Sequence, residues 1–287
     1  MEARDLPQPQ VPQAPERDHE PIHPGSGRER GLLKKLWGPI LAAGLLLLKF
    51  GAKLKALLLL LPKVKLFATS ASMLVSIAAY QLIFGWAFSV GFVLLLLLHE
   101  LGHVFQLRRE GIKASAPLFI PFLGAAIWSK SLGDDAAAEA RVGLAGPILG
   151  SIATLVPLII WLATDEEFWQ ALTYVGFFLN LFNLLPVLPL DGGRAMAALS
   201  PAIWLAGFAL LAGLAFLYPN PIMILILVFG GFETWRRWRA RKDPAAREYH
   251  RIPGRTRALV AAVYLGLAVA LAIGMDATFL ERDFDDV

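Results

Sequence analysis

The sequence contains no cysteine, and this absence narrows the chemistry open to the chain. Without thiols it forms no disulfide bond and offers no thiolate ligand, so a metal site would have to use histidine, aspartate or glutamate. Charged residues are also scarce: they make up 17% of the 287 residues, whereas 56% are hydrophobic. The hydrophobic residues gather in runs of about 20, the length that crosses a bilayer. These proportions exclude a soluble domain and indicate a multi-pass membrane protein.

Seven segments have the composition of membrane spans. They are residues 66–88, 89–107, 143–163, 168–188, 202–218, 221–235 and 258–275. The fold class that we expect is therefore all-α, a polytopic transmembrane helix bundle. It forms a multi-pass membrane domain at residues 66–275, followed by an acidic C-terminal tail at residues 276–287.

The first 65 residues differ from this pattern. Residues 1–31 are rich in proline and polar side chains, which cannot bury a core, so we expect a disordered cytosolic tail without a signal peptide. Residues 32–65 contain two apolar stretches that are too short to span and are separated by lysines. For this segment we expect a basic interfacial or re-entrant structure.

The charges at the span ends predict an orientation. Basic residues cluster at alternate ends, for example Arg108 and Arg109 and the run RRWRARK that starts at Arg236. The opposite ends are acidic or uncharged, for example Asp165 and Glu166. The positive-inside rule places the basic ends and the N-terminus in the cytosol, with the protein in the cell membrane. Orientation accounts for the net charge of +4, so no nucleic acid partner is expected.

One span carries an unusual set of ionisable residues. The segment LLLLLHELGHVF, residues 94–105, contains His99, Glu100 and His103 in an apolar run. In a helix the two histidines lie one turn apart on one face and can share a cation, whereas Glu100 projects about 100° away. Each unpaired charge within a span costs about 2.5 to 3.5 kcal/mol on insertion scales. Three such residues together therefore indicate a metal site rather than a chance match.

A third ligand is expected, because two imidazoles leave a tetrahedral zinc incomplete and a chain without cysteine must supply a carboxylate. Asp191 is the candidate, since it closes the segment NLFNLLPVLPLDGGR at the end of a span. Pro186 and Pro189 stop the helix there, and Gly192 lets the chain turn. Unwound backbone at membrane depth is tolerated where it lines a protein-enclosed or water-filled cavity.

These two segments together resemble the signature motifs of the site-2 protease family of intramembrane zinc metalloproteases. The similarity is carried by HELGH and by Asn183, Pro186, Leu190, Asp191 and Gly192, and it extends over residues 66–194. It implies a three-span catalytic core at about residues 89–194, open to the cytosolic side. It also implies one Zn²⁺ per chain, held by His99, His103 and Asp191, with Glu100 as the general base.

The function implied by the resemblance is hydrolysis of peptide bonds within the transmembrane segments of membrane proteins, in regulated intramembrane proteolysis. The expected partners are those substrates, the lipid bilayer and an adaptor or regulatory membrane protein. Relatives often carry a PDZ or CBS domain, for which this chain has no room, so we expect a compact form. The alternative is a membrane zinc-binding or transport protein without protease activity. Transport requires ionisable residues along a path to the outer side, and the outer halves of the spans show none.

Three further features of the sequence concern helix packing, two asparagines and an apolar loop. Gly143, Gly146, Gly150 and Thr154 form a small-residue stripe that predicts close helix packing. Interhelical hydrogen bonding explains Asn180 and can also explain Asn183, but the family motif assigns Asn183 to substrate backbone or a developing oxyanion. The apolar loop at residues 116–126 is broken by prolines and is a poor helix. It would offer a strand edge to substrate or form a buried connection.

Overall fold

The computed structural model describes residues 62–200, 202–240 and 242–280. The expected N-terminal tail, nearly all of the basic segment at residues 32–65 and most of the acidic tail lie outside them.

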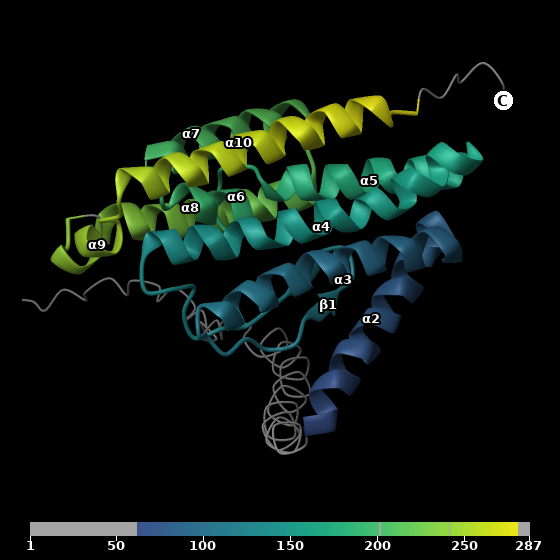
Figure 1. The fold of residues 1–287 in the computed structure, drawn as a ribbon, viewed down its shortest axis with the longest axis horizontal. Helices are drawn as coiled ribbons and strands as arrows, with labels where there is room; N and C mark the ends of the chain where they lie inside the picture. Colours follow the sequence, from purple (N-terminus) through teal and green to yellow (C-terminus); the bar gives the residue numbers. More distant parts are fainter. Residues whose placement is uncertain (1–61, 201, 241, 281–287) are drawn as a thin grey trace, which may run out of the picture. The chain divides into compact units, whose positions relative to one another are not determined.

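Helices make up most of the described structure, which confirms the all-α prediction (Figure 1). The helices are α2 (Pro62–Phe84), α3 (Trp86–Arg109), α4 (Ala136–Thr164), α5 (Glu167–Asn183), α6 (Asp191–Met196), α7 (Ala202–Leu217), α8 (Pro221–Ala240), α9 (Pro244–Tyr249) and α10 (Gly254–Ala277). Strands β1 (Leu118–Ile120) and β2 (Gly124–Ala126) pair as an antiparallel hairpin.

A helix occupies each of the seven predicted spans, but several predicted boundaries were wrong. The first two helices separate at Gly85, which has a φ of 77°, rather than between residues 88 and 89. A positive φ favours glycine, and only a residue without Cβ adopts it at little cost. Helix α4 begins at Ala136 rather than at Gly143, because the Asp135 carboxylate accepts a hydrogen bond of 2.7 Å from the Ala138 amide and caps the helix.

Two further boundaries differ at the other ends of helices. Helix α5 ends at Asn183, so the last five residues of the expected span at 168–188 belong to the unwound segment instead. Helix α8 continues to Ala240, five residues beyond the predicted end at Trp235, because hydrophobicity rather than helix length set the prediction.

Four of the described helices are long and apolar enough to cross a membrane: α2 from Phe67 onward, α3, α4 and α10. Helix α7 is also apolar but has only 16 residues. These helices fit a polytopic membrane bundle, although fewer than seven reach spanning length within the described residues.

Helix α4 is the centre of the bundle. It packs against α3 on one side and α5 on another, and the short helix α6 also lies against it (Figure 1). Small residues bring these helices close together. A Cβ on Gly102 of α3 would lie 2.3 Å from the Ala145 carbonyl oxygen of α4. The two backbones therefore touch beside the HELGH motif.

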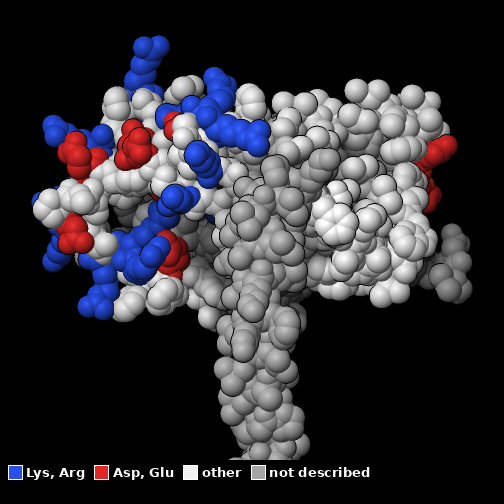
Figure 2. Space-filling view, turned by 90° about the horizontal axis from the view of Figure 1, so that it is seen from below, with Lys and Arg blue, Asp and Glu red and all other residues white. Residues whose placement is uncertain are grey.

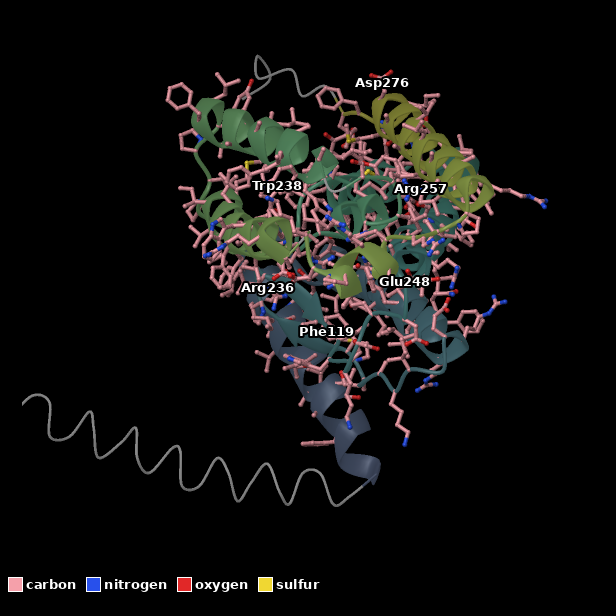
Figure 3. All side chains as sticks on the ribbon, turned by 90° about the vertical axis from the view of Figure 1, so that its left-hand side faces the viewer. Phe119, Arg236, Trp238, Glu248, Arg257 and Asp276 are labelled. Atoms are coloured by element: carbon pink, nitrogen blue, oxygen red, sulfur yellow. The ribbon has the colours of Figure 1, made fainter. Side chains whose placement is uncertain are left out.

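The β1–β2 hairpin lies against α2 and α3. Phe119 of β1 is buried with Ile77, Tyr80, Val93 and Leu96 (Figure 3). The Tyr80 hydroxyl accepts a hydrogen bond of 3.1 Å from the Phe122 amide in the hairpin turn. The expectation of a non-helical loop at residues 116–126 is confirmed, and β1 is anchored to the bundle.

Charged side chains divide between the two ends of the helices. Figure 2 shows Lys and Arg gathered, with some Asp and Glu, at the end where α9 lies in Figure 1. Figure 3 faces this end, with Arg236, Glu248 and Arg257 labelled. Asp165 and Glu166, which connect α4 to α5, and Glu167, the first residue of α5, lie at the opposite end. The helix ends thus alternate in charge as the sequence predicted.

Candidate metal centre

Helix α3 brings the two histidines of HELGH to one buried face. The exposed fractions of His99 and His103 are 2% and 5%, although each lies in a helix of apolar residues. The spacing of four residues places the two rings one turn apart on the same face, with their ring centres 5.0 Å apart. Their Nε2 atoms are 3.3 Å apart.

Asp191 reaches this face from a distant part of the chain. The unwound segment between α5 and α6 contains both prolines, and it places Asp191 at the first position of α6. Its side chain is 8% exposed. Glycine is required after it, because a Cβ on Gly192 would lie 2.0 Å from the Leu184 carbonyl oxygen.

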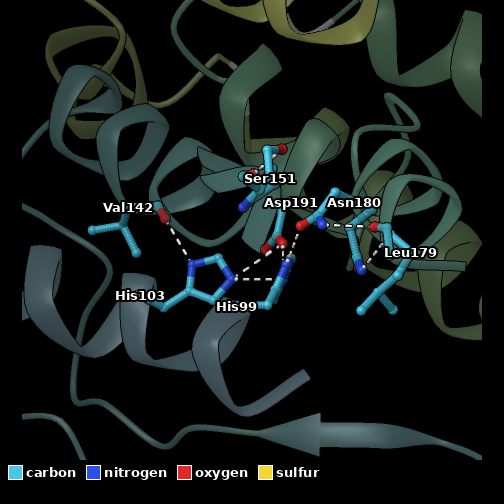
Figure 4. Close-up of polar contacts among 10 residues, drawn as sticks. His99, His103, Val142, Ser151, Leu179, Asn180 and Asp191 are labelled. Atoms are coloured by element: carbon cyan, nitrogen blue, oxygen red, sulfur yellow. Dashed lines mark hydrogen bonds and ion pairs between the residues drawn. The ribbon is translucent and has the colours of Figure 1, made fainter. Parts of the chain in front are cut away.

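The three side chains form a tight triangle of ligand atoms (Figure 4). The Asp191 Oδ2 atom is 3.0 Å from His99 Nε2 and 3.1 Å from His103 Nε2. Zinc–ligand bonds of 2.0 to 2.2 Å in tetrahedral geometry separate ligand atoms by roughly 3.3 Å. Among the described residues, His99, His103 and Asp191 form a group of side chains whose ligand atoms lie close enough together to hold one metal ion.

The outer ring nitrogens explain why this triangle suits a cation. His99 Nδ1 donates to the Asn180 Oδ1 atom at 2.9 Å, and His103 Nδ1 donates to the Val142 carbonyl oxygen at 2.8 Å. A neutral imidazole that donates from Nδ1 presents a lone pair at Nε2. Two such lone pairs and a carboxylate oxygen therefore converge on one point. Three acceptors without a donor among them repel each other unless they share a cation, so the donor set fits Zn²⁺.

Glu100 lies beside this triangle but outside it. Its side chain is 8% exposed, and no hydrogen bond or ion pair joins its carboxylate to another described residue. It lines the same cavity as both histidines and Asp191. A carboxylate in this position is free to exchange a proton with a molecule bound in the cavity.

The cavity has a volume of about 520 Å³ and is bounded by several elements. Its walls come from α3, α5, α6 and α8, with Tyr80 of α2 and residues 122–127 of the hairpin. Asn183 lines it too, and its Nδ2 atom donates to the Leu179 carbonyl oxygen at 2.9 Å. The structure thus brings all the predicted site residues to one cavity, with Asn183 beyond hydrogen-bonding distance of the three candidate ligands.

The small-residue stripe on α4 packs directly against the site. A Cβ on Gly146 would lie 2.2 Å from His103 Nε2, and one on Gly150 would lie 2.2 Å from Asn180 Oδ1. A Cβ on Gly143 would lie 2.8 Å from the Asp191 carbonyl oxygen. The predicted close packing is present. Helix α4 supplies the Val142 carbonyl oxygen that accepts a hydrogen bond from His103, and α5 supplies the Asn180 side chain that accepts one from His99.

Asn180 has a more specific place than the sequence indicated. The expected interhelical hydrogen bond exists, but its partner is His99, a candidate ligand. Asn180 is 1% exposed, and its Nδ2 atom donates to the Gly176 carbonyl oxygen at 2.8 Å, which turns Oδ1 toward the histidine. The only signal in the sequence was a polar residue one turn before Asn183.

We expect Asn180→Ala to weaken zinc binding by about 10- to 100-fold, because it removes the group that fixes the orientation of His99. Asn183→Ala is the matched comparison, since Asn183 lies one turn later on α5 without touching a ligand. It should leave zinc affinity unchanged and lower only the rate of hydrolysis. Zinc competition with a chromophoric chelator measures the zinc affinity of both variants. Equal losses of affinity would show that Asn180 has no special role.

A buried carboxylate on α4 joins this helix to α8 and α9, in the C-terminal part of the chain. Glu139 of α4 is 1% exposed, and Arg237 of α8 donates to its two oxygens at 2.8 and 3.0 Å. The Tyr249 hydroxyl donates to the same carboxylate at 2.7 Å. Burial raises the pKa of Tyr249 well above its ordinary value, so the hydroxyl keeps its proton.

This cluster also reaches the Asp191 turn. The Arg237 guanidinium lies 5.3 Å from the ring centre of Trp204, whose Nε1 atom donates to the Gly193 carbonyl oxygen at 2.6 Å. The basic run at Arg236 was interpreted as an orientation signal alone. The structure shows that its second arginine also anchors α4 and, through Trp204, contacts the turn that carries Asp191.

The comparisons with known proteins agree with this geometry. Residues 87–166 and 162–217 match Peptidase family M50. A zinc metalloprotease of Methanocaldococcus jannaschii, MJ0392, is 37% identical over 122 residues, which cover 40% of this chain and 34% of that protein. Rip3 of Mycobacterium tuberculosis, provisionally named a zinc metalloprotease, is 30% identical over 178 residues, which cover 56% of this chain and 43% of that protein. The chain thus spans less than half the length of these relatives.

Proposed function

Because residues 87–217 match Peptidase family M50, we propose that the chain belongs to this family, the site-2 protease family, and that the protein is an intramembrane zinc metalloprotease. Its substrates would be the transmembrane segments of other membrane proteins, and its role regulated intramembrane proteolysis. The observation that carries the proposal is the convergence of His99 Nε2, His103 Nε2 and Asp191 Oδ2 within a buried cavity of a membrane helix bundle.

We assign the three converging side chains as zinc ligands and Glu100 as the general base. Bound zinc would supply a Lewis acid that polarises a scissile carbonyl and lowers the pKa of water toward 7. Glu100 would accept a proton from the attacking water at its carboxylate and deliver it to the leaving nitrogen. Its burial keeps bulk water away from that exchange. Asn183, on the cavity wall, would donate from its amide to substrate backbone or to a developing oxyanion.

The substrate has to enter the cavity in an unwound form. A helical peptide keeps its carbonyls in hydrogen bonds within the helix, so helix-weakening residues near the cut would favour hydrolysis. The hairpin turn and β2 form part of the cavity wall, which supports a strand-like substrate lying there. An adaptor or regulatory membrane protein would select which substrates reach this wall.

The direct test is cleavage of a single-span model substrate reconstituted with the purified chain in liposomes. Cleavage should require zinc and stop when a chelator removes it. A preparation that binds zinc with high affinity but never cuts any span would favour the alternative, a zinc-binding or transport protein. Zinc uptake into the same liposomes then separates those two possibilities.

We further propose that the basic helix ends face the cytosol and that the protein lies in the cell membrane. In this chain without cysteine, a cysteine introduced at Glu166 should react with an impermeant maleimide on intact cells, whereas one at Ala240 should react only after permeabilisation. Labelling in the reverse order would invert the orientation and place the opening of the site on the outer side.

A further inference from the structure

A second cavity lies on the outside of the bundle, away from the metal centre. Helix α4 forms its floor, and α3 and α10, which lie on either side of α4, form its walls (Figure 1). The cavity has a volume of about 390 Å³ and is lined almost entirely by apolar side chains. On the floor these are Leu144, Ala145, Ile148, Leu149 and Ile152. We call it the α4 groove.

The length of the α4 groove matches one leaflet of a bilayer. Its lining on α4 runs from Arg141 to Ile152, which are 11 positions apart. A helix rises 1.5 Å per residue, so this stretch is about 16 Å long. The hydrocarbon core of a bilayer is about 30 Å thick, and one leaflet takes half of it. The groove therefore begins at the basic end of the helices and stops near the midplane.

The lining of the groove indicates the kind of occupant. A space about 16 Å long that is lined by aliphatic side chains suits a hydrocarbon chain, which needs no hydrogen-bond partner. Phe105 and Leu259, which are 61% and 64% exposed, line its two walls and face the surrounding membrane.

Three helices each carry an arginine toward the basic end of the groove. Arg141 of α4 lines it directly, and the Arg109 guanidinium lies 5.7 Å from the ring centre of Phe105. Arg255 is one turn before Leu259 on the same face of α10. It is exposed and has no hydrogen bond or ion pair with another described residue.

One acidic residue offsets part of this charge. The Glu110 carboxylate accepts hydrogen bonds of 2.7 and 2.9 Å from the Arg141 guanidinium. That pairing holds the pKa of Glu110 below its ordinary value, so the carboxylate stays ionised and neutralises Arg141. Arg109 and Arg255 form no hydrogen bond or ion pair with another described residue, although the charge of Arg109 also helps to lower the pKa of Glu110.

We propose that the α4 groove binds an anionic phospholipid, with one acyl chain along α4 and the phosphate of the headgroup between Arg109 and Arg255. The site lies on the face of α4 away from the metal cavity and does not depend on protease activity. It requires only that the bundle lies in a membrane. With the orientation proposed above, the lipid comes from the cytosolic leaflet, where basic side chains meet anionic headgroups.

Native mass spectrometry of the full chain in detergent tests this site. Phosphatidylglycerol and phosphatidylcholine with the same acyl chains are titrated separately, and the chain should retain one phosphatidylglycerol with the higher affinity. Each arginine at an anionic lipid surface contributes about fivefold in affinity, so the double variant Arg109→Gln/Arg255→Gln should lose about 25-fold. Arg236→Gln is the matched control, because Arg236 is an exposed arginine that lies on α8 and pairs with Glu233. It should bind the lipid as the unaltered chain does.

A photoactivatable phosphatidylglycerol with its reactive group near the acyl terminus locates the chain within the site. Adducts should fall on peptides that contain Ile152 or Val263, and Ile148→Trp should abolish them by filling the floor. Equal affinity for the two lipids, a double variant that binds as well as Arg236→Gln, or adducts confined to other helices would each overturn the proposal.

Discussion

Glu100→Gln is expected to keep zinc and to lose peptide hydrolysis by about 10²- to 10⁴-fold, the range for removal of a general base. Glutamine has nearly the same shape as glutamate but cannot accept the proton. The prediction follows from the position of Glu100, which lines the cavity without contributing an atom to the triangle of ligands. Zinc content of the purified variant and turnover of a single-span substrate are the two measurements.

His99→Ala and Asp191→Ala provide the contrast, because each removes one corner of the triangle and should lose both zinc and activity. If Glu100→Gln loses as much zinc as His99→Ala, then Glu100 is a ligand and the division of roles proposed here is wrong. If Glu100→Gln keeps full activity, another group must transfer the proton.

Gly146→Ala should have an effect of similar size for a different reason. A methyl group at this position would lie 2.2 Å from His103 Nε2 and 2.4 Å from Cε1 of the same ring. The ring has little room to retreat, because it is buried and its Nδ1 atom is bonded to the Val142 carbonyl oxygen. We expect zinc affinity to fall by about 100-fold, and hydrolysis to fall with it.

Gly266→Ala is the control for the helix itself. Gly266 lies in α10 with open space where a Cβ would be, so alanine there should leave zinc binding intact and raise helix stability slightly. Thermal unfolding of both variants separates a local effect on His103 from a loss of fold. Unchanged zinc affinity in a folded Gly146→Ala protein would mean that the ring can move and that the α4 stripe serves packing alone.

The sequence predicted the residues at the centre of the site because their chemistry is conspicuous there. His99, Glu100 and His103 interrupt an apolar run, and Asp191 follows prolines that end a helix. Ionisable side chains at membrane depth are costly, so each of them indicates a role. Their meeting in one cavity required the fold, since no rule of spacing places Asp191 within 3.1 Å of His103.

The residues that position the candidate ligands and pack α4 could not be predicted from the sequence in the same way. Val142 contributes only its carbonyl oxygen, which every residue possesses, so its side chain carries no signal. Glu139 lies outside the span predicted at residues 143–163, where a single acidic residue carries no signal of a structural role. Only tertiary packing shows that it is buried and paired with Arg237, 98 positions later.

Helix ends were the weakest part of the prediction for a related reason. Hydrophobicity marks where lipid contacts a helix, whereas caps and turns decide where the helix stops. Asp135 and Gly85 set two of these ends through a single hydrogen bond and a single positive φ. Both features are local and do not depend on hydrophobicity, so a count of apolar residues does not detect them.

The measurement that tests the central proposal most directly is the position of the cut in a model single-span substrate. His103 lies six residues before the end of α3 at Arg109, about 9 Å along the helix, so the site is below the membrane surface and on the basic side of the midplane. Mass spectrometry of the fragments should therefore place the cut within the cytosolic half of the substrate span. Replacing the residues around the cut with leucine and alanine should slow cleavage, because unwinding must come first. Cuts in a loop outside the membrane, or rates that ignore helix stability, would contradict intramembrane proteolysis and indicate a membrane-anchored peptidase instead.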